Sequence, residues 1–170
     1  GRIEWSLLRE MVASPQCLEI HVSGNDGVSD RHEALTGPTW IMAKRQLSAR
    51  GRRNRPWIMP EGNLAATLVF KPWATPAEAA KRSFMAANAL FQALAIAAPG
   101  ARLTLKWPND VLLNGGKVAG ILLESASSGP VVDWLAIGVG VNLLNSPAVV
   151  TEGGSADPVC LRKETGVEIA

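Results

Sequence analysis

The chain of 170 residues has a mass of 18.0 kDa and is 47% hydrophobic, which suits one globular domain with a sizeable core and argues against a disordered chain. Its 17 basic and 15 acidic residues give a formal net charge of +2, and no apolar run reaches the roughly 18 residues of a membrane-spanning helix. Two distant cysteines, Cys17 and Cys160, and an N-terminus without the form of a secretory signal predict buried thiols in a cytoplasmic protein with no membrane partner.

The first predicted elements are short. Residues 1–16 are expected to form a helix or arm that ends near Pro15, and Cys17–Val22 alternates apolar and polar residues as a half-buried strand does. After a polar turn, residues 28–36 are compatible with a short helix, and Pro38–Lys44 is a second strand that is apolar enough to be central. This strand leads directly into a basic loop.

Residues 44–55 (KRQLSARGRRNR) contain six basic and no acidic side chains, so the rest of the chain holds 11 basic against 15 acidic residues. Arginine presents a planar fork of donors that suits carboxylates and phosphates, and Gly51 lets the backbone approach a ligand closely. Positive charge focused in one loop favours a specific anionic ligand, such as a triphosphate. An RNA-binding loop is the alternative, although neither a second basic segment nor an RNP-like aromatic surface accompanies it.

A strand and a clearly delimited helix are predicted after the basic loop. The strand is Leu64–Phe70, whose apolar residues share one side. The stretch Thr75-Pro76-Ala77-Glu78 has the capping-box pattern, with proline at the first helical position. The helix is expected to end at Pro99-Gly100 and to pack on the sheet through one stripe: Phe84, Ala87, Phe91, Leu94 and Ala98.

A polar hairpin is predicted next. Arg102–Trp107 is a strand, Pro108 forms a rigid corner, and Val111–Leu113 is joined to Val118–Leu123 across Asn114-Gly115-Gly116, which accepts the positive φ of a tight turn. Four polar side chains lie among the apolar residues of this hairpin: Lys106, Asn109, Asp110 and Lys117. These polar side chains either solvate an edge hairpin or belong to a functional site.

Val131–Leu143 is predicted to be a further strand with two glycines inside it. Gly138 and Gly140 weaken a strand, so they mark either a bulge or the close approach of another backbone or a ligand. Residues 145–159 are rich in Pro, Gly and Ser and are expected to form a loop, and a helix is expected to start at Leu161.

The candidate site residues are arginines, lysines and amides with a single carboxylate. A Walker motif, a Rossmann fingerprint and a nucleophile elbow are absent from the sequence, and no positioned histidine can be identified for Ser23. Lys117 follows a Gly-Gly turn, so it can aim its ammonium at charge that develops on a phosphate or carboxylate oxygen. This set of groups favours electrostatic activation of phosphoanhydride chemistry over acid–base catalysis.

Three segments, in matching order and spacing, resemble the biotin protein ligases over residues 18 to about 145: Arg50-Gly-Arg-Arg-x-Arg55-x-Trp57, Lys106-Trp-Pro-Asn-Asp110 with Lys117-Val-Ala-Gly-Ile121, and Ile137-Gly-Val-Gly-Val-Asn142. The resemblance implies an α+β domain with a mixed β-sheet and helices packed mainly on one side. It also implies an enzyme that uses ATP and Mg²⁺ to activate biotin as biotinyl-5′-AMP. The biotinyl group would then pass to a lysine of a biotin carboxyl carrier protein.

Carried over position by position, the resemblance assigns the site residues. The catalytic residues are Lys117 and Arg52. The biotin pocket is matched by Ser23, Gln46, Arg50, Arg52, Lys117, Gly120, Leu122, Gly138 and Gly140. The ATP site is matched by Arg52, Arg55, Lys106, Asn109, Lys117 and Asn142. Asp110 is either a Mg²⁺ ligand or a partner of Lys117.

The sequence departs from the family pattern at three positions. Gly24 stands where the family usually has threonine, and Ala49 and Asn54 replace two glycines of the arginine loop. If either of these two positions needs a positive φ, alanine costs about 1 kcal/mol and asparagine less.

The expected organisation is one catalytic domain over residues 1–170, without the family's small C-terminal β domain and without an N-terminal DNA-binding domain. No DNA partner is therefore expected, and a homodimer is compatible with the resemblance. Three alternatives stay open: a lipoate ligase or octanoyl transferase relative, a catalytically silent homologue that binds biotin, and a nucleic-acid-binding domain driven by residues 44–55.

Overall fold

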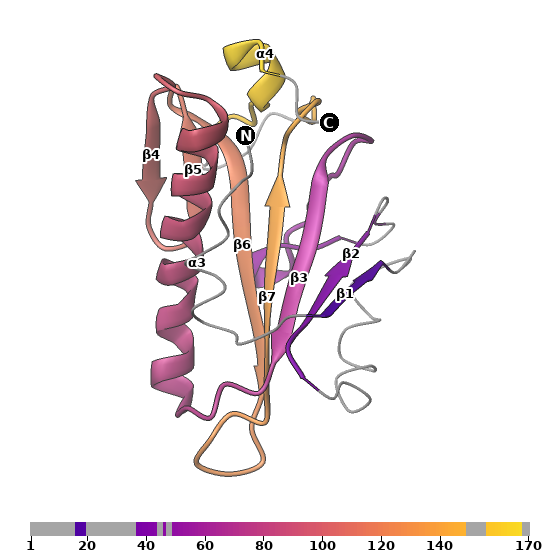
Figure 1. The fold of residues 1–170 in the computed structure, drawn as a ribbon, viewed down its shortest axis with the longest axis vertical. Helices are drawn as coiled ribbons and strands as arrows, with labels where there is room; N and C mark the ends of the chain where they lie inside the picture. The colour runs from indigo at the N-terminus through magenta and orange to yellow at the C-terminus, as the bar shows by residue number, and fades with distance from the viewer. Residues whose placement is uncertain (1–15, 20–36, 44–45, 47–48, 149–155, 168–170) are drawn as a thin grey trace.

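The computed structural model describes residues 16–19, 37–43, 46, 49–148 and 156–167, with only the backbone described for residues 16–19. These residues form a seven-stranded sheet in the order β1-β2-β3-β7-β6-β5-β4 (Figure 1). β1 and β2 are parallel, and every other neighbouring pair is antiparallel, so the predicted mixed sheet is confirmed. The strands are β1 Gln16–Glu19, β2 Thr39–Met42, β3 Leu64–Phe70, β4 Leu103–Lys106, β5 Asp110–Leu113, β6 Gly116–Ala126 and β7 Trp134–Val141.

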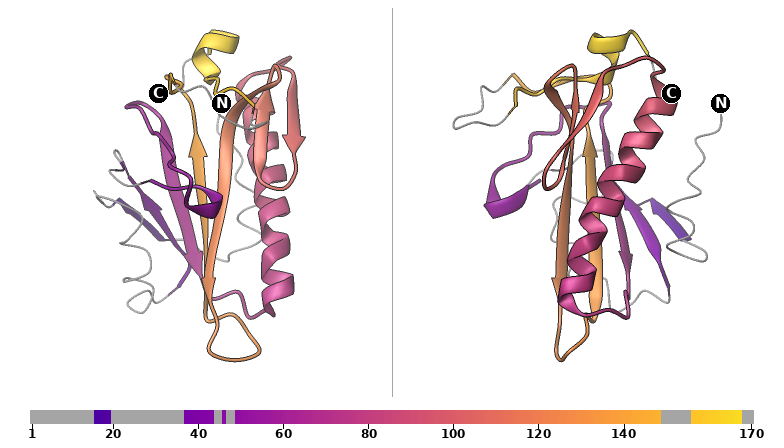
Figure 2. Two further views of the ribbon diagram at one scale, coloured as in Figure 1. Left: turned by 180° about the vertical axis from the view of Figure 1, so that it is seen from behind. Right: turned by 90° about the vertical axis from the view of Figure 1, so that its left-hand side faces the viewer.

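One long helix, α3 (Pro76–Ala97), covers one face of the sheet (Figures 1 and 2). Because side chains alternate along a strand, Leu68, Ile121 and Ile137 turn toward this face. They pack there in one core with Leu90 and Leu94 of α3, and all five side chains are buried. The residues that alternate with these along the same strands point to the opposite face of the sheet.

The N-terminus of α3 has the predicted capping box. The Thr75 hydroxyl accepts a hydrogen bond from the Glu78 backbone N–H, and the Glu78 carboxylate accepts one from the Thr75 backbone N–H at 3.0 Å. Proline at the first helical position, Pro76, costs no hydrogen bond there because that N–H has no partner within the helix. The start of the helix is therefore set by local sequence.

The predicted sheet-facing stripe of α3 is only partly correct. Ala87 and Leu94 are buried, as expected, but Phe84 is 47% exposed. In this part of the helix the buried positions are Ala79 and Ala86, whereas Ala98, at the far end of the predicted stripe, is buried as expected.

Thr75→Ala is expected to lower the free energy of unfolding by about 1 kcal/mol, or the Tm by about 2–4 °C, because the N-cap is lost. Hydrogen bonds from the backbone and then the side chain of Thr75 hold the pKa of Glu78 below its ordinary value of 4.5. Since the folded pKa is the lower one, this contribution to stability is present above pH 4.5 and is lost as the pH falls through the folded pKa.

Thermal unfolding of both proteins from neutral pH to about pH 3 tests this expectation. The difference in Tm between wild type and Thr75→Ala should shrink at acid pH. A difference that stays constant over the whole range would contradict the capping role of the ionised Glu78 carboxylate.

The predicted polar hairpin is β5–β6, and its turn has the expected geometry. Asn114 and Gly115 have φ values of 53° and 90°. The Asn114 Nδ2 donates a hydrogen bond to Glu164 Oε2 at 2.8 Å, which ties the turn to α4 (Leu161–Thr165). α4 is the helix predicted to start at Leu161, and it ends early because Gly166 takes the left-handed conformation with φ 73°.

Several strand ends differ from the prediction, and the largest differences are at β6 and β7. β6 continues past Leu123 to Ala126, and β7 begins at Trp134 instead of Val131. The Asp133 N–H donates to the Ala126 carbonyl at 2.9 Å, so the residues between these strands close a hairpin. The segments predicted as helices at residues 1–16 and 28–36, and the end of the first predicted strand at residues 20–22, lie outside the described residues except for residue 16. Neither α3 nor α4, the α-helices of the described part, is both long and apolar enough to span a bilayer.

Candidate functional site

A cleft of about 1110 Å³ opens on the face of the sheet opposite α3. Its floor comes from neighbouring strands, where Gly120 of β6 lies opposite Gly140 of β7 and Leu122 lies opposite Gly138. These residues alternate along the strands with the side chains that pack on α3. Figure 2 shows residues 49–58 and α3 on opposite sides of the sheet, so this loop forms the roof of the cleft.

Trp57 lies directly on the glycine floor. A Cβ atom at Gly140 would be 2.9 Å from three atoms of the indole, and one at Gly120 would be 3.4 Å from the ring. Glycine at position 140 therefore makes room for the Trp57 side chain, whereas the sequence predicted a bulge or the approach of another backbone or a ligand. Trp57 was not among the predicted site residues. Its position at the end of the arginine motif was the one sequence feature that pointed to a role in the site.

Gly138 is different, because a Cβ atom there would meet nothing closer than the Leu122 carbonyl oxygen at 3.5 Å. That separation is an ordinary van der Waals contact, so the protein itself could hold a side chain at this position. The missing side chain leaves open space above the floor of the cleft, which a ligand can occupy.

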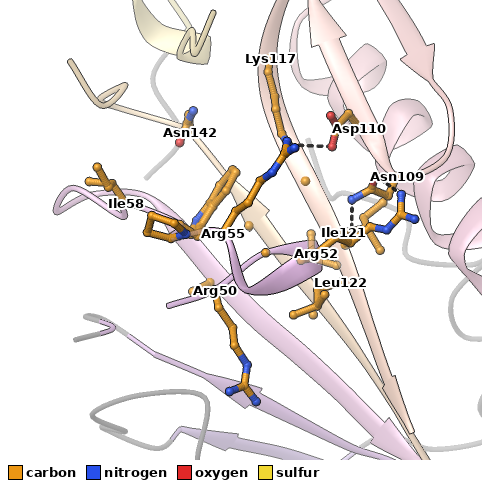
Figure 3. Close-up of a pocket in the computed structure, with 18 of the residues that line it drawn as sticks. Arg50, Arg52, Arg55, Ile58, Asn109, Asp110, Lys117, Ile121, Leu122 and Asn142 are labelled. Carbon is orange, nitrogen blue, oxygen red and sulfur yellow. Dashed lines mark hydrogen bonds and ion pairs between the residues drawn. The ribbon is translucent and has the colours of Figure 1, made fainter. Parts of the chain in front are cut away.

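Lys117 reaches into the cleft just after the hairpin turn (Figure 3). Its Nζ lies 2.7 Å from Asp110 Oδ1 and 5.4 Å from the centroid of the Trp57 ring. The two charged side chains are only 21% and 16% exposed, so water screens the ion pair weakly. Of the two roles predicted for Asp110, the pairing with Lys117 is the one observed.

Asp110 keeps unused hydrogen-bonding capacity in this arrangement. Its Oδ1 is buried and forms no hydrogen bond of acceptable geometry within the described part of the chain, although the Lys117 ammonium lies close by. A buried carboxylate oxygen of this kind needs a compensating charge or donor, and among the described residues Lys117 supplies the charge. Ligand atoms or a cation entering the cleft could therefore compete for it.

The arginine loop turns sharply above the cleft. The Trp57 N–H donates to the Ala49 carbonyl at 2.9 Å, which closes the loop. Arg53 and Asn54 both adopt the left-handed conformation, with φ values of 58° and 55°. Asparagine tolerates this conformation, so Asn54 can replace the family's glycine at little cost. Ala49 does not have a positive φ, so alanine causes no backbone strain at that position.

The arginine side chains of this loop point in different directions. Arg50 forms an ion pair with Glu124 at 3.0 Å, and Figure 3 shows its side chain pointing away from Lys117. Arg52 Nη1 donates to Asn109 Oδ1 at 3.5 Å, and Arg55 also lines the cleft. Because both side chains are partly exposed to water, the Arg50–Glu124 pair adds little stability.

Asn109 is held at the open edge of β6. Its Nδ2 donates to the Ile121 carbonyl at 2.8 Å, and the Ile121 N–H donates to the Asn109 carbonyl at 2.9 Å. The amide oxygen is thus turned toward Arg52. The Pro108 corner and this pair of bonds bring the end of the hairpin beside the arginine loop.

All but two of the predicted site residues line this one cleft. Ser23 lies outside the described residues, and Lys106, at the end of β4, is not part of the lining. Asn142 lines the cleft but is only 2% exposed, and its amide is hydrogen-bonded to Asn63 and Val159. The predicted residues that the structure brings together are Gln46, Arg50, Arg52, Arg55, Asn109, Asp110, Lys117, Gly120, Leu122, Gly138, Gly140 and Asn142.

Sequence reasoning missed one wall of the cleft. Pro147, Ala156 and Pro158 line it, and Lys117 forms an isolated β-bridge with Pro158. This wall comes from the stretch that was predicted only as a loop. Its composition carries no signal for a contact with Lys117.

The described residues contain no group of three or more His, Cys, Asp or Glu side chains that could hold a metal ion. Asp110 nevertheless offers one buried carboxylate oxygen at the wall of the cleft. Because Mg²⁺ commonly binds through one or two carboxylates together with nucleotide phosphates and water, Asp110 fits as a single protein ligand.

Two curated relatives align with a large part of the chain. The biotin–[acetyl-CoA-carboxylase] ligase of Paracoccus denitrificans is 55% identical over 134 residues, which cover 78% of this chain and 56% of the relative. The bifunctional ligase/repressor BirA of Bacillus subtilis is 36% identical over 110 residues, which cover 64% of this chain and 34% of the relative. The chain therefore spans about half the length, or less, of these relatives.

The fold and the family are also matched. The biotin protein ligase from Aquifex aeolicus in complex with biotin and ATP superposes with a TM-score of 0.69 and 24% identity, covering 91% of this chain and 63% of that one, which shows a shared fold. Residues 22–142 match the model of the biotin/lipoate A/B protein ligase family. Since this match covers well over half of the sequence, the chain belongs to the biotin/lipoate A/B protein ligase family.

Proposed function

We propose that the chain provides the catalytic cleft of a biotin protein ligase, which activates biotin with ATP and transfers it to a lysine of a biotin carboxyl carrier protein. The observation that carries this proposal is a floor of glycines that leads up to a shielded lysine. Gly138 leaves space for an apolar ligand, and Lys117 Nζ lies in the same cleft with Asp110 as its close partner.

The relatives support biotin as the substrate. The Paracoccus denitrificans relative is named a biotin–[acetyl-CoA-carboxylase] ligase, and the solved Aquifex aeolicus protein is a complex with biotin and ATP. The aligned region of the first relative includes most of this chain. The cleft residues that we assign to biotin and ATP follow from this likeness and from their shared position.

In the first step, a carboxylate oxygen of biotin bonds to the α-phosphorus of ATP, and pyrophosphate leaves with the electron pair of the broken P–O bond. Both reactants are anions, so their approach requires positive charge between them. Lys117 supplies this charge at a fixed point, and Arg52 and Arg55 supply more from the loop above. One well-placed group of this kind contributes about 10² to 10³ in rate.

In the second step, the neutral amine of the acceptor lysine attacks the carbonyl carbon of biotinyl-5′-AMP, AMP leaves, and the amine loses its proton. The loop of residues 49–58 covers the cleft and would keep water from the adenylate in the meantime. Because Arg52 hydrogen-bonds to Asn109, opening this roof requires that contact to break.

We assign Mg²⁺ to the phosphates of ATP, with Asp110 as its protein ligand. The ion supplies charge neutralisation on the phosphates when it is bound. Asp110 would hold the ion through the carboxylate that also pairs with Lys117.

The substrate can be tested by offering the protein ATP with biotin, lipoate or octanoate and detecting the acyl-adenylate by mass spectrometry. Biotinyl-5′-AMP is expected with biotin alone. Formation of lipoyl- or octanoyl-adenylate in its place would move the chain to another branch of its family. Bound biotin without any adenylate would indicate a silent homologue.

A further inference from the structure

Asn63, in the turn before β3, joins this turn to the chain that follows β7. Its Oδ1 accepts hydrogen bonds from the backbone N–H groups of three successive residues, Leu143, Leu144 and Asn145, at 3.0, 3.1 and 3.2 Å. Its Nδ2 donates to the Asn145 carbonyl at 2.8 Å and to Asn142 Oδ1 at 3.4 Å. One side chain thus fixes both the course of the chain after β7 and one side of the Asn142 amide.

Two further contacts join the same two turns. Asn145 Nδ2 donates to the Glu61 carbonyl at 3.0 Å, so the turns are bonded in both directions. Gly62 has a φ of 85°, and a Cβ atom there would lie 2.5 Å from Leu144 Cδ1. Glycine at position 62 both adopts this φ without strain and leaves room for Leu144. Asn63 is therefore held in a fitted position beside the end of β7.

The side chain of Asn63 is fully used by the protein. It offers two N–H groups and one oxygen, and the hydrogen bonds to the chain after β7 engage all of them. Asn63 is also not one of the described residues that line the cleft. A role of Asn63 in the site must therefore act through a neighbour.

Asn142 is that neighbour, because it lines the cleft and its amide keeps unused capacity. One N–H group of its Nδ2 donates to the Val159 carbonyl at 3.1 Å, and its Oδ1 accepts one hydrogen bond, from Asn63. An asparagine amide can donate twice and accept twice. Among the described residues, one donor and one acceptor position of Asn142 therefore remain for a ligand.

These two positions are useful only if the amide points in one direction. Turned by half a rotation, the Asn142 amide would oppose its Nδ2 to Asn63 Nδ2 and its Oδ1 to the Val159 carbonyl. We propose that Asn63 is a positioning residue, which holds the Asn142 amide in the orientation that binds ATP. This inference rests on the proposed ligase function, in which Asn142 belongs to the ATP site.

Asn63→Asp separates the two tasks of this side chain. The carboxylate has the same shape and still accepts from the three backbone N–H groups, but it cannot donate to Asn142 Oδ1. We expect the KM for ATP in biotin-dependent pyrophosphate release to rise about threefold to tenfold, as for the loss of one neutral hydrogen bond. The KM for biotin should stay within about twofold of the wild type. An unchanged KM for ATP would overturn the proposal.

A double variant tests whether Asn63 acts through Asn142. Asn142→Ala removes the amide that Asn63 is proposed to hold, so it should itself raise the KM for ATP. Adding Asn63→Asp to Asn142→Ala should then leave the KM for ATP within about twofold of the single variant. If the two effects multiply instead, Asn63 acts by another route and the proposal is wrong.

Asn145→Ala is the matched control within the same turns. It loses the hydrogen bond to the Glu61 carbonyl but keeps the backbone groups that bond to Asn63. It should lower the Tm while both KM values stay at those of the wild type. A rise in the KM for ATP equal to that of Asn63→Asp would reduce the role of Asn63 to general stability.

A second measurement keeps the inference separate from the proposed function. If the wild type shows no biotin-dependent pyrophosphate release, the proposed function fails on its own. Solvent exchange of the Asn142 side-chain NH2 protons, followed by NMR and assigned by their loss in Asn142→Ala, then decides the inference. Exchange should be faster in Asn63→Asp than in the wild type or Asn145→Ala, and equal exchange in all three would refute the role of Asn63.

Discussion

Lys117→Ala is expected to slow biotin-dependent adenylation by at least about a hundredfold while the protein stays folded. The Lys117 side chain provides a fixed positive charge where two anionic substrates must meet. Because this side chain is largely shielded from water, its charge interacts strongly with the substrates. Its ammonium contacts Asp110 at 2.7 Å and the Trp57 ring at 5.4 Å, and neither contact belongs to the main core under α3. Pyrophosphate release measures the rate, and circular dichroism measures the fold.

Lys71→Ala is the control for this experiment, because Lys71 is an exposed lysine outside the cleft. Lys117→Arg adds a geometric test, since a planar guanidinium cannot replace a compact ammonium at a fitted position. We expect it to recover only part of the activity. A folded Lys117→Ala protein with turnover within about threefold of the wild type would remove Lys117 from the mechanism.

Gly138→Ala is expected to raise the KM for biotin by about tenfold to a hundredfold with little change in Tm. The protein has room for the added methyl group, whose nearest neighbour would be the Leu122 carbonyl oxygen at 3.5 Å. Any loss of affinity must then come from a ligand that lies over the glycine. Overpacking of this kind costs about 1–3 kcal/mol, which sets the size of the expected effect.

Gly129→Ala serves as its control, because a Cβ atom at Gly129 meets nothing within 4 Å. Gly140→Ala is less informative, since its methyl group would push against Trp57 at 2.9 Å and would disturb the roof as well as the floor. An unchanged KM for biotin in Gly138→Ala would mean that the ligand does not lie on this part of the sheet.

Features set by neighbouring residues could be predicted from the sequence. The capping box of Thr75 and Glu78 and the turn at Asn114-Gly115 need only residues a few positions apart, and both form as predicted. The strand Leu64–Phe70 was predicted with its observed bounds, because a clear alternation of apolar residues is bounded by turn residues. Local chemistry was sufficient for these elements.

Features that depend on distant parts of the chain could not be predicted. Phe84 fits the helical spacing, yet it is exposed, because Ala79 and Ala86 form the buried side of that part of α3. The motif pattern placed Arg50 in the site, but it cannot reveal that Glu124 pairs with it on the side away from Lys117. Asp157 and Val159 contact Lys117 through backbone groups, which every residue has, so the sequence carries no trace of the contact.

Most of the residues that the motifs assigned to the site line one cleft, and the structure shows the contacts that hold them. Lys117, Asp110 and the glycines of β6 and β7 share one cleft, and Trp57 explains why position 140 is glycine. The homodimer, the extent of the domain and the lack of a DNA partner stay predictions. The roles of the individual residues in binding biotin and ATP also stay proposals until variants are measured.

The most direct measurement of the central claim is the exchange of labelled pyrophosphate into ATP, because this exchange reports reversible formation of an acyl-adenylate. The ligase account predicts that exchange requires biotin and is lost in Lys117→Ala. Exchange that is equally fast without biotin would contradict it. So would the absence of exchange in a folded protein that is saturated with both biotin and Mg-ATP.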